Sequence, residues 1–205
     1  MPEAPFVLMI AGPNGSGKTT LTDQLRRDGV DFGRYINPDE IAKTLSGEYS
    51  VRVRKAQMLA DQDRERCLRR LENFSFETVM SHPSKVDVLR RAKERGFHVI
   101  VYFVATESPD LNVARVAQRV ALGGHDVPED RIRERYGRAL ALLPEALSFA
   151  DETVLFDNSY ALGPAETAVL RPFCRRAGPE WTLAPPVPGW ALRSLKDWLP
   201  PLRPL

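Results

Sequence analysis

The residues best suited to chemistry lie near the N-terminus, in Gly12-Pro-Asn-Gly-Ser-Gly-Lys-Thr19. They fit the pattern G-x-x-x-x-G-K-[ST] at every defined position. Glycines let the backbone turn tightly, so that its N–H groups point at phosphate oxygens, and the following helix N-terminus adds partial positive charge. The pattern predicts that Lys18 reaches the β- and γ-phosphates of ATP and that the Thr19 hydroxyl binds Mg²⁺. The predicted nucleotide-binding residues are Gly12, Pro13, Asn14, Gly15, Ser16, Gly17, Lys18, Thr19 and Thr20.

Two other large classes of nucleotide-binding protein fit the sequence less well. Motor proteins and helicases usually carry two adjacent acidic residues after a buried strand, but here Ala105-Thr106 and Asp157-Asn158 follow the two apolar segments. GTPases recognise their base with Asn-Lys-x-Asp, a motif that the sequence lacks. The remaining class is a small kinase, which must activate a substrate hydroxyl and shield the γ-phosphoryl group from water.

A kinase of this kind needs a carboxylate that accepts the proton of the substrate hydroxyl. Asp39 lies just past a predicted strand at residues 31–37, where it should face the γ-phosphate, and its neighbour Glu40 is a weaker candidate. Asp39 follows Pro38, so the alternative is that it merely caps a helix. The glycine-rich loop upstream favours the catalytic interpretation.

Glu77 is a second candidate carboxylate. It follows two phenylalanines in Phe74-Ser-Phe-Glu-Thr78, where an idle carboxylate would cost free energy. Glu77 and Thr78 should emerge at the carboxyl end of a strand and contact the substrate hydroxyl or a Mg²⁺-bound water. The alternative is a salt bridge between Glu77 and an arginine at the edge of the core.

Arginines dominate residues 111–138, and Gly123-Gly-His-Asp-Val-Pro128 divides them into two groups. Planar guanidinium groups can clamp the charge that spreads over a transferring phosphoryl group. We therefore predict a hinged helical lid that closes over ATP. For any one arginine the alternative is a solvated pair with a nearby acid, and for His125 it is a turn or packing role. The arginines are Arg115, Arg119, Arg131, Arg133, Arg135 and Arg138.

Apolar runs alternate with helical patterns along the chain, which predicts an α/β fold of the P-loop type, with a parallel sheet covered by helices on both faces. Ligands of such sheets bind beyond the carboxyl ends of the strands. The pattern also predicts Ser84 as a helix N-cap and Gly96 as a helix stop. Residues 165–173 could be strand or helix. The expected strands are 6–11, 31–37, 73–79, 98–104 and 153–156, and the expected helices are 18–27, 38–45, 51–72, 84–95, 111–122 and 128–147.

Length and composition bound the rest. The 205 residues suit a single kinase domain, with the lid at 111–138 and a proline-rich tail at 184–205 that wraps the surface, anchored by Trp190, Leu195 and Trp198. The net charge of +2 argues against nucleic acid as a partner. Cys67 and Cys174 suit reduced thiols, and the apolar runs are too short to cross a membrane, so we expect a cytoplasmic protein.

Four segments of the chain resemble segments of the zeta-toxin family and follow one another in the same order. They are Ala11 to Thr20, Asn37-Pro-Asp-Glu-Ile-Ala42, Phe76-Glu-Thr78, and Arg119 through Gly123-Gly-His-Asp-Val-Pro128 to Tyr136. The resemblance covers about residues 6–160, and the segment between the arginines is its most specific part. It implies a P-loop kinase, similar to nucleoside kinases and with an arginine-rich helical lid, that uses ATP and Mg²⁺.

The resemblance also implies roles for single residues. Asp39 would deprotonate the acceptor hydroxyl, Glu77 would contact the sugar, and Arg119 together with Arg133 or Arg135 would stabilise the transferring phosphoryl group. We favour Arg135 for that role, since it follows the hinge as in the family pattern, and assign Arg133 to substrate binding. Residues 157–159 would lie near the adenine.

Characterised zeta toxins phosphorylate the 3′-hydroxyl of the amino sugar in UDP-N-acetylglucosamine, so this is the first acceptor to expect. Those toxins carry an arginine three residues after the base, where this chain has Ala42. Another hydroxyl acceptor (a nucleoside, an antibiotic or an RNA end) and a non-catalytic ATP-binding regulator therefore stay open, as does a separate antitoxin protein as partner.

Overall fold

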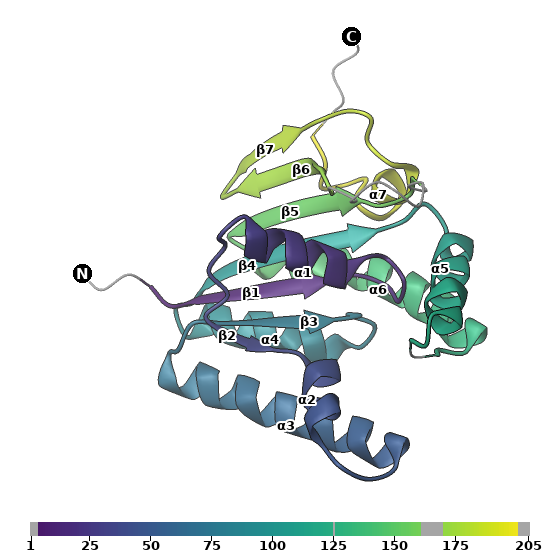
Figure 1. Ribbon diagram of the computed structural model, residues 1–205. Coiled ribbons are helices and arrows are strands. Elements are labelled where there is room, and N and C mark those ends of the chain that lie inside the picture. Colours follow the sequence, from purple (N-terminus) through teal and green to yellow (C-terminus); the bar gives the residue numbers. More distant parts are fainter. Residues whose placement is uncertain (1–3, 125, 161–169, 201–205) are drawn as a thin grey trace.

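The computed structural model describes residues 4–124, 126–160 and 170–200, and one mixed sheet runs through them (Figure 1). Its seven strands have the order β2-β3-β1-β4-β5-β6-β7. The first five strands in this order pair in parallel, and β6 and β7 extend the sheet with antiparallel pairings. The strands are β1 Phe6–Ala11, β2 Arg34–Ile36, β3 Phe74–Thr78, β4 His98–Ala105, β5 Glu152–Asp157, β6 Pro172–Ala177 and β7 Glu180–Leu183.

The apolar runs form the central strands because both faces of the sheet are covered there. Along β1, Leu8 and Ile10 face a cluster that includes Leu21 and Leu25 of α1, while Val7 and Met9 face the opposite cluster. Fully burying an aliphatic side chain of this kind contributes about 1.5 to 3 kcal/mol. This two-sided burial is what an uninterrupted apolar strand needs.

Helices lie on both faces (Figure 1). α1 covers one face, and residues of α3, α4, α6 and α7 contribute to the core on the other. None of the helices in the described part is long and apolar enough to cross a membrane. The helices are α1 Lys18–Arg27, α2 Pro38–Thr44, α3 Tyr49–Arg70, α4 Pro83–Glu94, α5 Pro109–Ala121, α6 Glu129–Phe149 and α7 Gly189–Ser194.

The start of α4 differs from the expectation. His82, not Ser84, is the N-cap, and its Nδ1 accepts a hydrogen bond from the backbone N–H of Ser84 at 3.2 Å. Pro83 then takes the first helical position, which suits its restricted backbone. The end of the helix was predicted correctly, since α4 ends at Glu94 with Arg95 as its C-cap, and Gly96 follows with φ +82°.

The C-terminal region is the largest departure from the expected fold. Residues 172–183 add β6 and β7 to the sheet, and the tail expected to wrap the surface from residue 184 instead packs α7 into the core. The expected anchors Trp190 and Leu195 are fully buried, and Trp198 packs against the same cluster. Residues 165–169, whose state the sequence left open, lie outside the described residues, whereas Phe173 belongs to β6. Cys67 and Cys174 are buried free thiols.

The predicted lid corresponds to α5 and the first half of α6. Ile132 and Tyr136 of α6 are buried, and the Tyr136 hydroxyl donates to the backbone carbonyl of Thr106 at 2.7 Å. α6 continues past Pro144 to Phe149, so the second lid helix is continuous with a core helix. His125 lies outside the described residues.

Candidate active site

The glycine-rich loop joins β1 to α1 and is held from α5. Gly15 has φ +76°, and a Cβ there would lie 2.6 Å from the backbone carbonyl oxygen of Asn112. The Asn112 side-chain amide in turn donates to the carbonyl of Asn14 at 2.5 Å. A larger residue at position 15 would therefore have to displace backbone, which explains why this loop position is glycine.

The N-terminus of α1 is open to an anion. Gly17 is its N-cap, with φ +100°, and no described side chain caps the helix. The first backbone N–H groups therefore keep their hydrogen-bonding capacity for a phosphate. A cleft of about 370 Å³ lies directly at this end, lined by Gly15, Gly17, Lys18, Thr19, Thr20, Arg115, Arg119, Asn158 and Tyr160.

Lys18 connects the loop to the charged residues around it. Its Nζ donates to the carbonyls of Gly12 and Pro13, both at 2.9 Å. Burial lowers the pKa of Lys18 from 10.5 to about 8, although the carboxylates of Glu77 and Asp39 oppose that shift. Near pH 7 the ammonium is still mostly protonated and can bind phosphate oxygens.

Thr19 is the residue that the sequence predicts as a magnesium ligand. It lies in the first turn of α1, is exposed and lines the cleft. No group of three or more His, Cys, Asp and Glu side chains within the described ranges could hold a metal ion by itself. A Mg²⁺ bound through one hydroxyl and nucleotide phosphates needs no such group, so the residues present fit this ion.

Asp39 is exposed in the first turn of α2. The helix cap is Asn37, whose side-chain oxygen accepts from the backbone N–H of Asp39 at 2.8 Å. Asn37 and not Asp39 is therefore the N-cap, although Asp39 lies in the first turn, where a carboxylate complements the helix dipole. Its carboxylate is close enough to Lys18 to raise the pKa of that ammonium.

Glu77 ends β3 inside a hydrogen-bond network. Its Oε1 accepts from the Thr22 hydroxyl at 2.5 Å and from the Tyr35 hydroxyl at 2.7 Å. Burial and the nearby Glu77 raise the pKa of Tyr35, so the phenol stays protonated and donates. Two hydroxyl donors therefore hold Glu77, where the sequence left open a salt bridge with an arginine.

Thr78 shapes the strand end. Its carbonyl accepts from the backbone N–H of Gly12 at 3.3 Å, and its hydroxyl accepts from the backbone N–H of Met80 at 3.0 Å. The parallel register pairs Thr78 with Ala11, which sets the end of β3 beside the glycine-rich loop.

The lid arginines separate into different environments. Arg119 lines the cleft and is near enough to Lys18 to lower its pKa further, and Arg115 lines the same cleft. Arg133 instead forms ion pairs with Asp110 at 2.6 Å and Glu129 at 2.8 Å. Arg135 is half-buried on α6 and is not among the residues that line the cleft.

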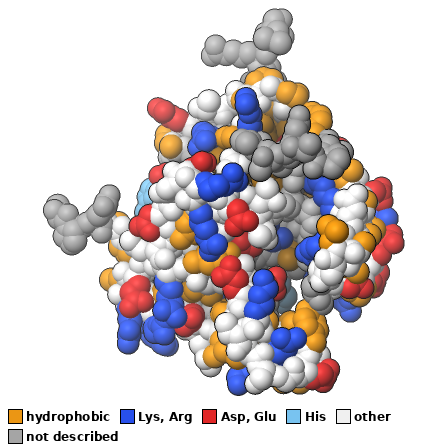
Figure 2. Space-filling model, in the orientation of Figure 1, with side chains coloured by type: hydrophobic (Ala, Val, Ile, Leu, Met, Phe, Trp, Pro, Cys, Tyr) orange, Lys and Arg blue, Asp and Glu red, His pale blue; other side chains and the backbone are white. Residues whose placement is uncertain are grey.

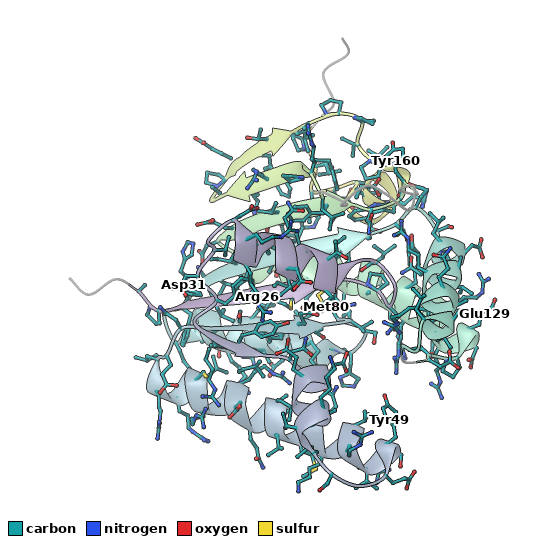
Figure 3. All side chains as sticks on the ribbon, in the orientation of Figure 1. Arg26, Asp31, Tyr49, Met80, Glu129 and Tyr160 are labelled. Carbon is teal, nitrogen blue, oxygen red and sulfur yellow. The ribbon has the colours of Figure 1, made fainter. Side chains whose placement is uncertain are left out.

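The segment after β5 forms the far wall of the cleft. The Asn158 amide donates to the backbone carbonyl of Ser16 at 2.9 Å, which ties this wall to the loop. Asp157 Oδ1 accepts from the Ser159 hydroxyl at 2.6 Å and from the Trp190 indole at 2.9 Å. Tyr160 lies on this side of the molecule, and Tyr49 lies on the α3 side (Figure 3).

Sequence reasoning missed several residues at this site. Tyr35 and Asn37 could have been found, because residues two apart on a strand share a face, and their side chains are hydrogen bonded at 2.9 Å. Tyr49, whose pKa is raised by burial and by Asp39, sits near Asp39 and Arg119. Nothing in the helical pattern marked Tyr49 or Asn112.

Comparison with known proteins gives the family. Residues 1–159 match the zeta toxin family. An uncharacterized protein of Haemophilus influenzae is 30% identical over 137 residues, which cover 63% of this chain and 91% of that protein.

Solved structures agree on the fold. The AvrRxo1-ORF1:AvrRxo1-ORF2 complex with sulphate ions matches with a TM-score of 0.65 at 16% identity, over 89% of this chain and 61% of that chain. A structure of the PezAT chromosomal toxin–antitoxin system of Streptococcus pneumoniae matches with a TM-score of 0.52 at 15% identity, over 76% of this chain and 69% of that chain. The chain belongs to the zeta toxin family and is a phosphotransferase with the P-loop kinase fold.

Proposed function

We propose that the protein transfers the γ-phosphoryl group of ATP to a hydroxyl group of a sugar nucleotide, with the 3′-hydroxyl of UDP-N-acetylglucosamine as the first acceptor to test. One observation carries the proposal: the Lys18 ammonium, which lines the phosphate cleft, lies close enough to Asp39, Glu77 and Arg119 for each of them to act on it electrostatically, and these three residues come from three other elements. ATP as donor is further supported by a similar fold solved with ATP, the AvrRxo1-ORF1:-ORF2 complex, at 18% identity and a TM-score of 0.59.

Each residue of the site has a separate role in phosphoryl transfer. Asp39 accepts the proton of the acceptor hydroxyl, whose oxygen forms a bond to the γ-phosphorus while the bond from that phosphorus to the β–γ bridging oxygen breaks. Lys18 and the N-terminus of α1 hold the β- and γ-phosphates. Mg²⁺ at Thr19 would neutralise charge on the same phosphates. The products are ADP and the phosphorylated acceptor.

Glu77 and the lid orient the reactants. Glu77, held by Thr22 and Tyr35, can accept a hydrogen bond from an acceptor hydroxyl through its remaining capacity. Arg119 stabilises charge on the transferring group, and Arg135 is the proposed second lid arginine. A substrate role for Arg133 requires that its guanidinium leave Asp110 and Glu129.

The test is an acceptor screen. The protein is mixed with [γ-³²P]ATP, Mg²⁺ and a panel of UDP-sugars, nucleosides, hydroxyl-bearing antibiotics and short RNAs, beside Lys18→Ala and Asp39→Asn. We expect label on UDP-N-acetylglucosamine with the wild type and none with either variant. Label on another acceptor would show that the protein is a kinase with a different substrate. If the protein binds ATP but labels no acceptor, the result would instead favour a non-catalytic ATP-binding regulator.

A separate antitoxin protein is the proposed partner. A solved structure of similar fold comes from the PezAT toxin–antitoxin system, and a kinase that consumes a sugar nucleotide of its own cell would need such control. Expression in a bacterial host should arrest growth with the wild type and not with Asp39→Asn. Equal growth of both strains would contradict a toxic role.

A further inference from the structure

Asn112 joins the first lid helix, α5, to the glycine-rich loop. Figure 1 shows α5 standing beyond the carboxyl ends of the strands, and its buried residues are Asn112 and Val116. The side chain of Asn112 is fully buried and donates to the carbonyl of Asn14 at 2.5 Å. Its backbone carbonyl lies where a Cβ on Gly15 would meet it at 2.6 Å. The loop and the start of α5 are therefore in direct contact through both the side chain and the backbone of one residue.

The orientation of the Asn112 amide follows from its two partners. The carbonyl of Asn14 can only accept a hydrogen bond, so the side-chain nitrogen of Asn112 must face it. The side-chain oxygen then faces the hydroxyl of Thr106, which can donate to it. Thr106 is fully buried, and its backbone carbonyl accepts from the Tyr136 hydroxyl at 2.7 Å. A chain of hydrogen bonds thus runs from α6 through Thr106 and Asn112 to the loop.

Asn112 shares one side of α5 with the arginines of the cleft. Asn112 and Arg119 are seven residues apart on this helix, which is two turns and about 10 Å along its axis. Arg119 lines the cleft together with Arg115, which lies between the two. Because α5 is continuous from Pro109 to Ala121, the attachment at Asn112 determines how far the guanidinium of Arg119 stands from the loop.

We propose that Asn112 is a positioning residue for phosphoryl transfer, which fixes α5 to the glycine-rich loop so that Arg119 reaches the same phosphates that the loop binds. This rests on the proposed function, in which ATP is the donor. The N–H groups of the loop and a guanidinium from another element act on one phosphoryl group only when both are held in place. An error of about 1 Å in such an arrangement can cost about 100-fold in rate.

A positioning role differs measurably from a purely structural one. A residue that only stabilises the fold lowers the unfolding temperature, but it leaves the contribution of Arg119 to ATP binding unchanged. A residue that places Arg119 makes that contribution depend on itself. A double-mutant cycle measures this dependence directly.

Calorimetry would give the Kd of ATP with Mg²⁺ for the wild type, Asn112→Ala, Arg119→Ala and the double variant. We expect Asn112→Ala to weaken ATP binding by about tenfold, because the loop loses a buried partner. Arg119→Ala should weaken it by about 10- to 30-fold in the wild-type background. In the Asn112→Ala background, the same change should cost less than about threefold.

Asn158→Ala is the matched control. The Asn158 amide also donates to a carbonyl of the loop, that of Ser16 at 2.9 Å, but it comes from the segment after β5 and not from α5. Its effect on the Kd of ATP should therefore multiply with that of Arg119→Ala. Thermal unfolding shows whether each variant is folded. If Asn112→Ala is not, Thr106→Val takes its place, because it keeps the shape of Thr106 and removes the donor to Asn112; the same dependence on Arg119 is expected.

Three results would overturn the proposal. They are an unchanged ATP affinity in Asn112→Ala, an equal cost of Arg119→Ala in both backgrounds, and a dependence on Arg119 that is as large for Asn158→Ala as for Asn112→Ala. If the wild type does not bind ATP, the donor site fails, and the proposed function falls together with the role of Asn112. If the dependence is found but no acceptor is labelled, Asn112 keeps its role toward ATP and the acceptor part of the proposed function fails.

Discussion

At the scale of single residues, Lys18 is where burial and charge compete most directly. Its pKa of about 8 reflects burial, which exceeds the opposing effect of Glu77 and Asp39. Phosphate oxygens would raise that pKa again, because they stabilise the ammonium. Between pH 8 and the pKa of the bound state, ATP binding therefore takes up a proton.

The expected result is an ATP affinity that falls by about tenfold between pH 7 and pH 9, as the free protein loses the Lys18 proton. Calorimetry in two buffers of different ionisation enthalpy would show the proton uptake at pH 9. Lys18→Arg is the control, because arginine keeps its charge and should give a flat profile whatever its absolute affinity. A flat profile in the wild type would contradict the assignment.

Tyr35 tests the network that holds Glu77. Tyr35→Phe removes one of the two donors to Glu77 Oε1 and the acceptor of the Asn37 amide. We expect the free energy of unfolding in urea to fall by about 1 to 2 kcal/mol, because two partly buried polar groups lose a partner. The acceptor kcat/KM should fall as well.

Tyr160→Phe is the comparison for stability, since that side chain is 70% exposed and its free energy of unfolding should change by less than about 0.5 kcal/mol. Equal stability of Tyr35→Phe and the wild type would mean that the hydroxyl of Tyr35 does not support Glu77.

At the scale of elements, α7 couples the C-terminal region to the wall of the cleft. Trp190 is fully buried, its ring lies 5.8 Å from Phe103 and 5.6 Å from Phe173, and its indole N–H donates to Asp157. The backbone N–H of Trp190 also donates to Glu107 at 3.2 Å. This short helix thereby supports the segment after β5 that lines the cleft.

Trp190→Ala should lower the free energy of unfolding by about 3 to 5 kcal/mol, because it leaves a large cavity in the core. Trp190→Phe keeps a ring and should lose about 1 to 3 kcal/mol, because Asp157 loses a donor. Urea unfolding measures both. Leu192→Ala, on the exposed side of the same helix, is the control and should change little. Equal losses at positions 190 and 192 would contradict a core role for Trp190.

Elements differed in how well the sequence predicted them. β1, α1 and the loop between them followed from a continuous apolar run and a motif, because both signals are local. β6 was missed, because it places Arg175 and Arg176 in a strand. The Arg176 guanidinium lies over the rings of Trp181 and Trp198 and donates to backbone carbonyls at the end of α6, and a local sequence pattern shows none of these contacts. Arg133 was assigned to substrate, but its partner Asp110 comes from another helix, which local patterns do not place.

At the scale of the whole molecule, the segment that matches the family ends at residue 159, but the sheet continues beyond it with β6 and β7. β6 pairs with β5 along its length, and α7 packs on the core beyond it. Lys, Arg, Asp and Glu side chains are interspersed over the face shown in Figure 2, in keeping with the net charge of +2. This face therefore presents charges of both signs and no uniform field of one sign.

A chain that stops at residue 171 should not fold cooperatively, because it exposes the core side chains that Phe173, Cys174 and Trp190 cover. We expect it to lack a sharp thermal transition and to bind a hydrophobic dye. The full chain with Leu192→Ala is the folded comparison. A truncated chain that keeps a sharp transition would show that the matched region is stable without β6, β7 and α7.

The central claim is that Asp39 activates the acceptor for phosphoryl transfer. Asp39 and Glu40 are neighbours in the first turn of α2, and both are exposed, so Glu40→Gln is a matched control for Asp39→Asn. The measurement is the rate of ³²P transfer to the acceptor identified in the screen, with ATP affinity determined in parallel. The account predicts a loss of about 10²- to 10⁴-fold in Asp39→Asn with ATP binding retained, and a near wild-type rate in Glu40→Gln. A full rate in Asp39→Asn would contradict it.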